Sequence, residues 1–495
     1  MGLSRQTLIL ILPFIIFILC FAFMGAYQPL AYPTGADWAQ YMMGAQQVWW
    51  PAADTSYPEW RAPLYLYLLG LVAHGGSYLE AGSWLSSTGW FLMGGSLYGM
   101  ALLFRRPVLG LGLSLALLCM PLSVDGFHHL GPYPLIGGVC GAVWLSALAV
   151  MRTPTISNKW LVSFAISSGF ALALDSRSIL IVVAALPLIF KRWPLKSLVG
   201  AFIAFSVAWS PHFLLVRYLN LSLLPMREKL LEQRRFVLRH LQGDNLHPDH
   251  PEIDGLMSVC AQQPPMHAKL DWLWETCSWE MMIVNLKAWA ENGLGITLMW
   301  GILLFLSFRV WRWGLAIFML IGLGLVVPML IVWHPPRYAY PLMVPLLSSL
   351  PIAIVLVIEN TPVPRLLTSL FALLPVFFLW PAQVPNTEPM TWDFPPARIP
   401  LVEEVRQSVN AGDHYMDCAR LDTGLLWAPN NRMPANISTF LPSQSDCEGF
   451  IVNGNGWVLT KEGDPQLPSP LGYGWSPTKT FQDQNRGVIL WSRTL

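Results

Sequence analysis

The sequence predicts a polytopic α-helical membrane protein that ends in a small soluble domain. Three observations indicate this class. Of the 495 residues, 54% are hydrophobic and only 12% are charged, against about 25% charged residues in an average soluble protein. Apolar runs of about 16–23 residues, long enough to cross a hydrocarbon core, recur along most of the chain. Lys and Arg gather in alternate loops between these runs.

About eleven segments have the length and apolarity of a membrane span. They lie near 7–26, 83–104, 107–124, 134–151, 160–174, 178–190, 197–216, 293–308, 313–333, 341–358 and 366–380. The first segment has a cleaved signal peptide as its alternative, because a basic start precedes it. Its apolar run of about 20 residues exceeds the usual signal core of about 7–15 residues. We therefore expect an uncleaved anchor.

The basic residues predict the orientation. With a cytoplasmic N-terminus, every predicted inner loop carries Lys or Arg, whereas the short outer loops hold only Arg61, Arg177 and Arg337. Positive charge marks cytoplasmic loops. We therefore expect the N-terminus inside and the C-terminus outside the plasma (inner) membrane, with an active extracytoplasmic or periplasmic face. The net charge of +1 argues against nucleic acid as a partner.

Two parts follow from the composition. Residues 1–380 hold the spans and two long outer segments, 28–82 and 217–291. From 381 to 495 polar and Pro-rich residues replace the apolar runs, which predicts a soluble extracytoplasmic domain of about 115 residues. There we expect a small α/β fold, with a helix near 401–409 and strands near 414–419, 449–452 and 487–492.

Charged residues are absent from the predicted spans. Ion- and proton-coupled transporters usually place ionisable groups inside the bundle, so this pattern argues against them. The acids and the short-loop arginines instead gather at the predicted outer surface: Asp37, Asp54, Glu59, Arg61, Asp125, Asp175, Arg177 and Arg337. We therefore expect polar chemistry on lipid headgroups there, with membrane lipids as partners.

Three elements resemble the GT-C superfamily of polyprenyl-phosphate-sugar-dependent glycosyltransferases. Asp37 follows the first span, and the run Glu-Trp-Arg-Ala-Pro-Leu-Tyr at 59–65 is similar to an acid-Lys-Pro-Pro-Leu-Tyr box. The stretch 169–177 resembles a hairpin that ends in Thr-Arg, and Arg337-Tyr338 resembles an Arg-Tyr element before a late span. By pattern, the protein O-mannosyltransferases and the lipid A aminoarabinose transferase are the most similar.

This resemblance implies a GT-C-like architecture for residues 1–380 and a role in glycan biosynthesis at the cell envelope. Such enzymes pass a sugar from a polyprenyl-phosphate donor, with inversion, to a glycan, lipid or protein acceptor outside the cytoplasm. A carboxylate suits the role of general base on the acceptor. Arg suits the departing phosphate, because its planar fork matches the phosphate oxygens and stays charged.

We accordingly expect Asp37 to act as the catalytic base and Asp125 as a second catalytic acid. Each assignment has a structural alternative. Asp37 could stabilise a helix start, worth about 0.3–1 kcal/mol, and Arg177 could form a turn pair with Asp175. Glu59 and Arg61 could form an exposed ion pair of little energetic value, and Arg337 could be an interfacial anchor. The expected substrate-binding residues are Glu59, Arg61, Arg177, Arg337 and Tyr338.

Asp125, His128 and His129 form the one pattern that suggests a metal. In a helical turn they would share a face, and carboxylate and imidazole are good ligands for a divalent ion. Helix capping and ordinary loop polarity are the alternatives. A divalent metal ion is thus the only cofactor that the sequence suggests.

The cysteines fit the predicted sidedness. Cys20, Cys119 and Cys140 lie within spans, whereas the other four lie in outer segments. Even numbers in an oxidising compartment predict one disulfide in each segment, Cys260–Cys277 and Cys418–Cys447, with free buried thiols as the alternative.

Trp and Tyr recur from 38 to 67, as in the aromatic belts of membrane interfaces. Their spacing from Trp38 to Trp50 fits a helix that lies in the interface plane. Stacking of one or two rings on a sugar is the alternative.

Two other functions stay open. A polysaccharide polymerase or ligase of related architecture would concentrate Arg and His in a large outer loop, as 227–250 partly do. A non-catalytic transporter or assembly subunit is favoured if the outer acids prove dispensable.

Overall fold

The protein is described by a computed structural model of its whole chain. The residues whose structure is described are 5–27, 41, 44–45, 48–49, 63–74, 78–119, 131–153, 158–190, 193–219, 311–330, 340–359, 363–379, 405, 407–409, 413–419, 444–483 and 486–493. They form two compact units. The first comprises Met1–Gln28, Ser86–Phe127 and Pro132–Asn386, and the second comprises Pro29–Leu85, His128–Gly131 and Thr387–Leu495.

Helices make up the described part of the first unit. Apart from 293–308, which lies outside the described residues, each predicted span overlaps a helix. Their bounds are α1 (Arg5–Tyr27), α4 (Tyr78–Leu103), α5 (Pro107–Leu118), α7 (Tyr133–Arg152), α8 (Asn158–Leu174), η1 (Ser176–Ser178), α9 (Ile179–Ile189), α10 (Leu195–Tyr218), α15 (Trp311–Leu330), α16 (Tyr340–Ile358) and α17 (Arg365–Leu379). Among the described residues, α7, α10 and α16 are long and apolar enough to cross a membrane.

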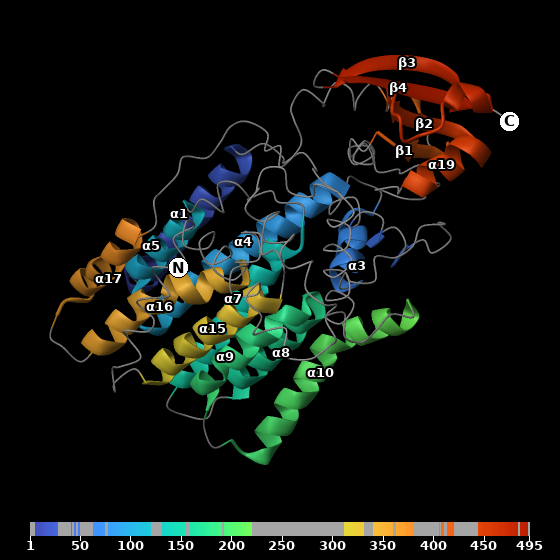
Figure 1. Ribbon diagram of the computed structural model, residues 1–495. Coiled ribbons are helices and arrows are strands. Elements are labelled where there is room, and N and C mark those ends of the chain that lie inside the picture. Colours follow the sequence, from blue (N-terminus) through green and yellow to red (C-terminus); the bar gives the residue numbers. More distant parts are fainter. Residues whose placement is uncertain are drawn as a thin grey trace. The chain divides into compact units, whose positions relative to one another are not determined.

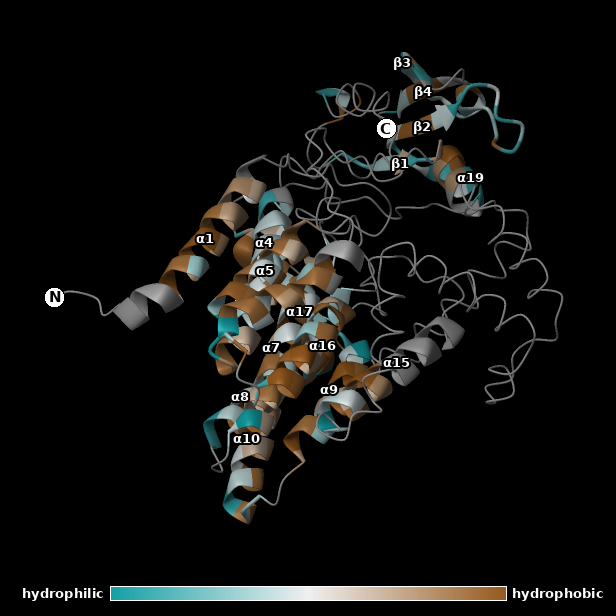
Figure 2. Cartoon of the chain, turned by 90° about the vertical axis from the view of Figure 1, so that its left-hand side faces the viewer, coloured by the Kyte–Doolittle hydropathy of each residue, from teal (hydrophilic) through white to brown (hydrophobic). Residues whose placement is uncertain are grey.

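Burial separates central from peripheral helices. The most apolar stretch of α7 is 83% buried, and that of α10 is only 11% buried. Figure 1 shows α7 between its neighbours α8, α9 and α16, with which it packs. By contrast α10 packs against α8 and exposes Phe202, Val207 and Leu214. Figure 2 shows apolar residues along most of the length of the helices of the first unit. Such an exposed apolar face suits lipid contact.

Glycines let the central helices approach closely. A Cβ at Gly89 of α4 would overlap the backbone of Pro134 in α7. A Cβ at Gly137 of α7 would lie 2.8 Å from the carbonyl oxygen of Tyr340, where α16 begins. One at Gly141 would lie 3.1 Å from Ser96 Oγ of α4. Small residues at these positions bring backbones together where no hydrophobic effect drives helices to associate.

The N-terminal part of the second unit contains α3 (Pro63–Val72) and described residues of 41–49, which are helical. Tyr41, Ala45 and Val48 are buried, at the spacing of one helix face. The Trp49 indole stacks on Tyr67, with 4.7 Å between ring centroids, and its Nε1 donates to the Tyr67 carbonyl at 3.0 Å. This aromatic segment therefore packs against α3.

A four-stranded sheet forms the C-terminal part of the second unit. Its strands are β1 (Tyr415–Asp417), β2 (Gly456–Lys461), β3 (Ser476–Asp483) and β4 (Arg486–Arg493), in the order β1-β2-β4-β3. The β1–β2 pair is parallel and is joined through α19 (Gln444–Asn453), whereas the other pairs are antiparallel. Ile451 of α19 packs with Val458, Trp475 and Trp491 in a core.

The sequence predicts three strands here, and one of those predictions is wrong. The strands predicted near 414–419 and 487–492 correspond to β1 and β4, but 449–452 belongs to α19. Its Phe-Ile-Val run has high strand propensity, yet Ile451 on the helix fills the core beneath the sheet. Near 401–409 the described residues 405, 407 and 408 are helical. The strands β2 and β3 were not predicted.

A disulfide joins Cys418, directly after β1, to Cys447 of α19. The sequence predicts the pairing of these two cysteines. The bond ties the parallel strand to its crossover helix and encloses a loop with a sequence separation of 29 residues. The other predicted pair, Cys260–Cys277, lies outside the described residues.

Replacing Gly89 by Ala should destabilise the helical unit by about 1–3 kcal/mol, because the new methyl group meets backbone that cannot move aside. Gly95→Ala in the same helix is the matched control, since a Cβ there meets nothing within 4 Å. It should be neutral or stabilising by up to about 1 kcal/mol. Thermal unfolding in detergent measures both, and equal shifts would contradict the packing argument.

Replacing Cys447 by Ser should lower the free energy of unfolding of the C-terminal sheet by about 2–4 kcal/mol, because a loop closure is lost. Cys119→Ser controls for the loss of a thiol, as Cys119 is exposed and free. Limited proteolysis of the full chain with and without denaturant reports the change. Unaltered cleavage of the sheet region would show that the bond adds no stability.

Candidate functional site

Among the predicted catalytic and substrate-binding residues, the structure describes Arg177. Asp37, Glu59, Arg61, Asp125, Arg337 and Tyr338 lie outside the described residues, as do the predicted metal ligands Asp125, His128 and His129. Within the described ranges no three His, Cys, Asp or Glu side chains form a metal-binding group. The site is therefore built outward from Arg177.

Arg177 lies in the tight turn between α8 and α9, which Asp175 organises. Asp175 has extended backbone angles, φ −157° and ψ 121°, and ends the run of α8. Its Oδ1 accepts a hydrogen bond from the Arg177 backbone N–H at 2.8 Å, and its carbonyl accepts from the Ser178 N–H at 3.0 Å. Asp is a favoured residue at this capping position, so the local sequence Leu-Asp-Ser-Arg dictates the turn.

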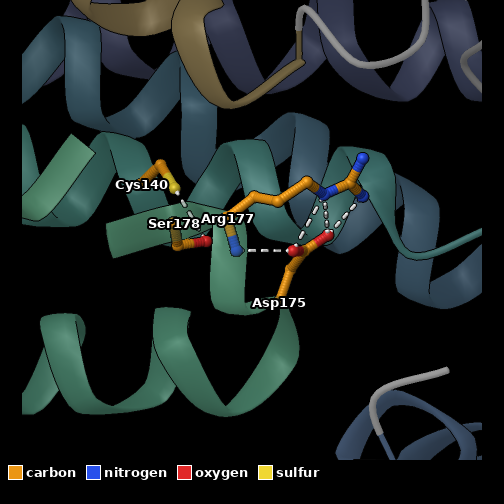
Figure 3. A network of polar contacts seen from close by, with 4 residues as sticks. All are labelled: Cys140, Asp175, Arg177 and Ser178. Atoms are coloured by element: carbon orange, nitrogen blue, oxygen red, sulfur yellow. Dashed lines mark hydrogen bonds and ion pairs between the residues drawn. The ribbon is translucent and has the colours of Figure 1, made fainter. Parts of the chain in front are cut away.

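The Asp175 carboxylate also holds the Arg177 side chain. Arg177 Nε donates to Oδ1 at 3.0 Å and to Oδ2 at 2.9 Å, and Nη2 donates to Oδ2. Figure 3 shows the guanidinium lying alongside the carboxylate. The two side chains are only 17% and 15% exposed. Charge-assisted bonds in such a half-enclosed place are stronger than a surface ion pair.

Residues of α7 complete the surroundings of this pair. The Arg177 guanidinium lies over the Tyr133 ring, 5.8 Å from its centroid. Cys140 Sγ donates to Ser178 Oγ at 3.7 Å, and both residues are fully buried. Tyr133 and Cys140 are seven residues apart and so share a face of α7. Neither residue is among the site residues predicted from the sequence, although Gly-Pro-Tyr-Pro at the start of a span is a visible signal.

The start of α16 reaches the same end of the bundle. The Tyr340 ring meets Trp90 edge to face at 5.4 Å between centroids, and its backbone lies against Gly137, one turn after Tyr133. The starts of α7 and α16 and the α8–α9 turn therefore share one end of the bundle.

This arrangement can hold a guanidinium in a fixed direction at the end of an apolar bundle. Asp175 neutralises the charge, so an incoming phosphate would compete with a carboxylate for the same donors. The contacts agree with the turn-pair alternative raised from the sequence. They also agree with an Arg that a carboxylate orients for a ligand.

Within the second unit, two aromatic residues of the segment 28–82 prove to be core residues. Tyr65 of α3 is fully buried and meets Tyr41 edge to face at 5.5 Å between ring centroids. Burial raises the pKa of Tyr65 above its usual value. Among the described residues nothing hydrogen-bonds to its hydroxyl. These two rings therefore do not offer free faces for stacking on a sugar.

Breaking the ion pair should cost stability. Asp175→Asn keeps an oxygen that can accept from the Arg177 N–H but removes the charge, and Arg177→Gln removes its partner. Each change should lower the free energy of unfolding by about 1.5–3 kcal/mol. A double-mutant cycle should give a coupling of about 0.5–3 kcal/mol. Strictly additive single effects would mean that the pair contributes nothing.

Comparison with known proteins returns no matching family model and no matching curated protein. Solved structures are similar at low identity. ArnT from Cupriavidus metallidurans in the apo state is 13% identical, with 96% of this chain and 97% of that chain covered and a TM-score of 0.48. The mycobacterial arabinofuranosyltransferase AftD is 12% identical, with 99% and 42% covered and a TM-score of 0.45. The Archaeoglobus fulgidus oligosaccharyltransferase is 12% identical, with 92% and 69% covered and a TM-score of 0.33. All three are glycosyltransferases of the GT-C superfamily, which the sequence elements resemble.

Proposed function

We propose that this chain is a membrane glycosyltransferase. It moves a sugar from a polyprenyl-phosphate donor to a glycan, lipid or protein acceptor on the extracytoplasmic face, with inversion at the anomeric carbon. In this proposal the end of the bundle that carries Arg177 faces the outside, and the N-terminus of the chain is cytoplasmic.

The Asp175–Arg177 pair at the end of an apolar bundle is the observation that carries the proposal. A charged pair taken out of water is costly unless its geometry is good, so a half-enclosed pair at this position needs a reason. Arg177 stays charged at all physiological pH values and matches phosphate with its planar fork. A carboxylate that fixes its direction in advance lowers the entropy cost of holding a lipid phosphate.

At the anomeric carbon the reaction forms one bond and breaks one, and a proton passes from the acceptor to Asp37. Asp37 accepts the proton of the acceptor hydroxyl or amine, and the acceptor atom bonds to the anomeric carbon. The bond from that carbon to the phosphate oxygen breaks, and its electron pair leaves with the polyprenyl phosphate. Arg61, Arg177 and Arg337 stabilise the charge that develops there. A single displacement of this kind inverts the anomeric centre.

The remaining predicted residues have supporting roles in this proposal. Asp125 is the second acid, and Glu59 and Tyr338 bind substrate. A divalent ion held by Asp125, His128 and His129 is part of the same hypothesis and would assist the leaving phosphate.

The chain between Arg337 and α16 is short, which supports a shared role for Arg337 and Arg177. Arg337 precedes Tyr340 by three residues, which span at most about 11 Å. Tyr340 itself lies against Gly137, close to the Tyr133 that underlies Arg177. This proposal therefore puts both arginines at one end of the bundle.

Mass spectrometry of glycans and envelope lipids tests the proposal. Cells that lack the protein should lose one mass of hexose, pentose or amino-sugar size, and the wild-type chain should restore it. Asp37→Asn should restore less than about 1% of it, because general-base catalysis contributes about 10²–10⁴-fold. Arg177→Gln should also fail, whereas Arg177→Lys should restore part of the product.

Asp54→Asn is the matched control, since it is an acid of the same outer segment with no assigned role. All variants are compared at equal levels of inserted protein. Full restoration by Asp37→Asn would make Asp37 a helix-start residue. A transport or assembly role would then replace the transferase proposal.

A further inference from the structure

At the opposite end of the bundle, arginines gather around the turn between α4 and α5. The length of α7 separates the two ends: Arg177 contacts its first residue, Tyr133, and Arg152 is its last. With a rise of about 1.5 Å per residue, this helix is about 30 Å long, the thickness of a hydrocarbon core. The second end therefore lies near the other membrane surface.

The turn itself holds Arg105 in an unfavourable backbone conformation. Its φ of 56° is left-handed, and in the described part of the chain no other residue except Gly has a positive φ. The Arg106 N–H bonds to the Ala101 carbonyl at 3.1 Å, and the Arg105 N–H bonds to that of Leu102 at 2.8 Å. This is a Schellman motif, in which Gly is the usual residue at the left-handed position. An Arg at this position places an exposed charge there at a conformational cost.

Arg106 is nearly buried, with 6% of its surface exposed. Its Nη1 donates to the carbonyl of Arg365, the first residue of α17, at 2.8 Å. Burial and the charge of Arg365 lower the pKa of Arg106, and the charge of Glu359 opposes them. The charges of Arg365 and Glu359 therefore both act on Arg106.

Arg152 connects the same group of residues. Arg152 forms a bidentate ion pair with Glu359, in which Nη1 donates to Oε2 at 2.7 Å. Its guanidinium also lies 4.6 Å from the centroid of the Phe104 ring. The side chains of Arg152 and Glu359 are 30% and 32% exposed. Glu359 is thus already engaged by Arg152 and cannot fully neutralise the others. The arginine cluster is defined as Arg105, Arg106, Arg152 and Arg365.

Positive charge is in excess in this cluster. Among the described residues just named, Glu359 is the acid, and it pairs with Arg152 while its charge also acts on Arg106. Two helix N-termini add partial positive charge, because α5 and α17 both begin there and pack together. The N-cap residue of α5, Arg106, makes no side-chain capping bond. An anion would satisfy the cluster and these helix starts together.

We propose that the arginine cluster binds a phosphate oxyanion, and that the source is the headgroup of an anionic phospholipid in the adjacent leaflet. Arg105 and Arg365 are exposed and can reach a headgroup, while the buried Arg106 and the ion-paired Arg152 hold the helix ends in place. A site of this kind would bind one lipid at the junction of α4, α5, α16 and α17. It is independent of the proposed glycosyl transfer.

Native mass spectrometry on the full chain in nanodiscs tests the lipid site. Discs contain phosphatidylcholine alone or with phosphatidylglycerol or cardiolipin, and retained lipid is counted. The wild-type chain should retain anionic lipid selectively. Arg105→Gly should weaken this binding about fivefold, and Arg105→Gly with Arg365→Gln about 25-fold, because each surface arginine contributes a factor of about five. Arg105→Gly should fold well, since Gly favours the left-handed position.

Lys196→Gln is the matched control. Lys196 is an exposed basic residue at the start of α10, which packs against α8. Because Lys196 is not part of the cluster, its loss should leave lipid retention within about twofold. The proposal fails if phosphatidylcholine is retained as well as anionic lipid, or if the double variant retains as much anionic lipid as the wild-type chain. The arginines would then serve only to orient the chain in the membrane. Displacement of the lipid by inorganic phosphate would overturn the lipid assignment in favour of a soluble phosphate.

Discussion

Close backbone contact between α7 and its neighbours is the constraint on which the helical unit depends. Lipid tails are as apolar as Leu, so helices in a bilayer gain little by burying apolar side chains against one another. They gain from tight packing, and Gly89, Gly137 and Gly141 permit it. The same contacts bring the starts of α7 and α16 together, and with them the surroundings of Arg177.

The apolar interior then decides where charge is found. Charges cannot lie unpaired in hydrocarbon, so the described charges are found at the two ends of the helices. The ends differ in balance. At one end Asp175 forms an ion pair with Arg177, which leaves a neutral, oriented pair. At the other end the cluster of four arginines contains one acid, Glu359, which pairs with Arg152, and this leaves excess positive charge. A neutral, oriented ion pair suits a substrate-binding group, and excess positive charge suits a permanently bound anion.

The C-terminal sheet depends on a different interaction. A small domain buries little apolar surface, and the bond between Cys418 and Cys447 supports the β1–α19 crossover by limiting the unfolded chain. The strand predicted at 449–452 failed here because strand propensity yields to packing. Ile451 contributes more by filling the core beneath Trp475 and Trp491 than its β-branched character costs in a helix.

The sequence by itself determined the class, the position of nearly every helix and the confinement of charge to their ends, because hydrocarbon imposes strict rules on length and polarity. It also marked Asp175 and Arg177 as neighbours, since they share a turn. Only the tertiary structure decided that Tyr133 and Cys140 adjoin Arg177, and that Arg106 meets Arg365 from 259 positions away. Contacts between helices distant in sequence leave no local periodic pattern, because they depend on which faces pack together.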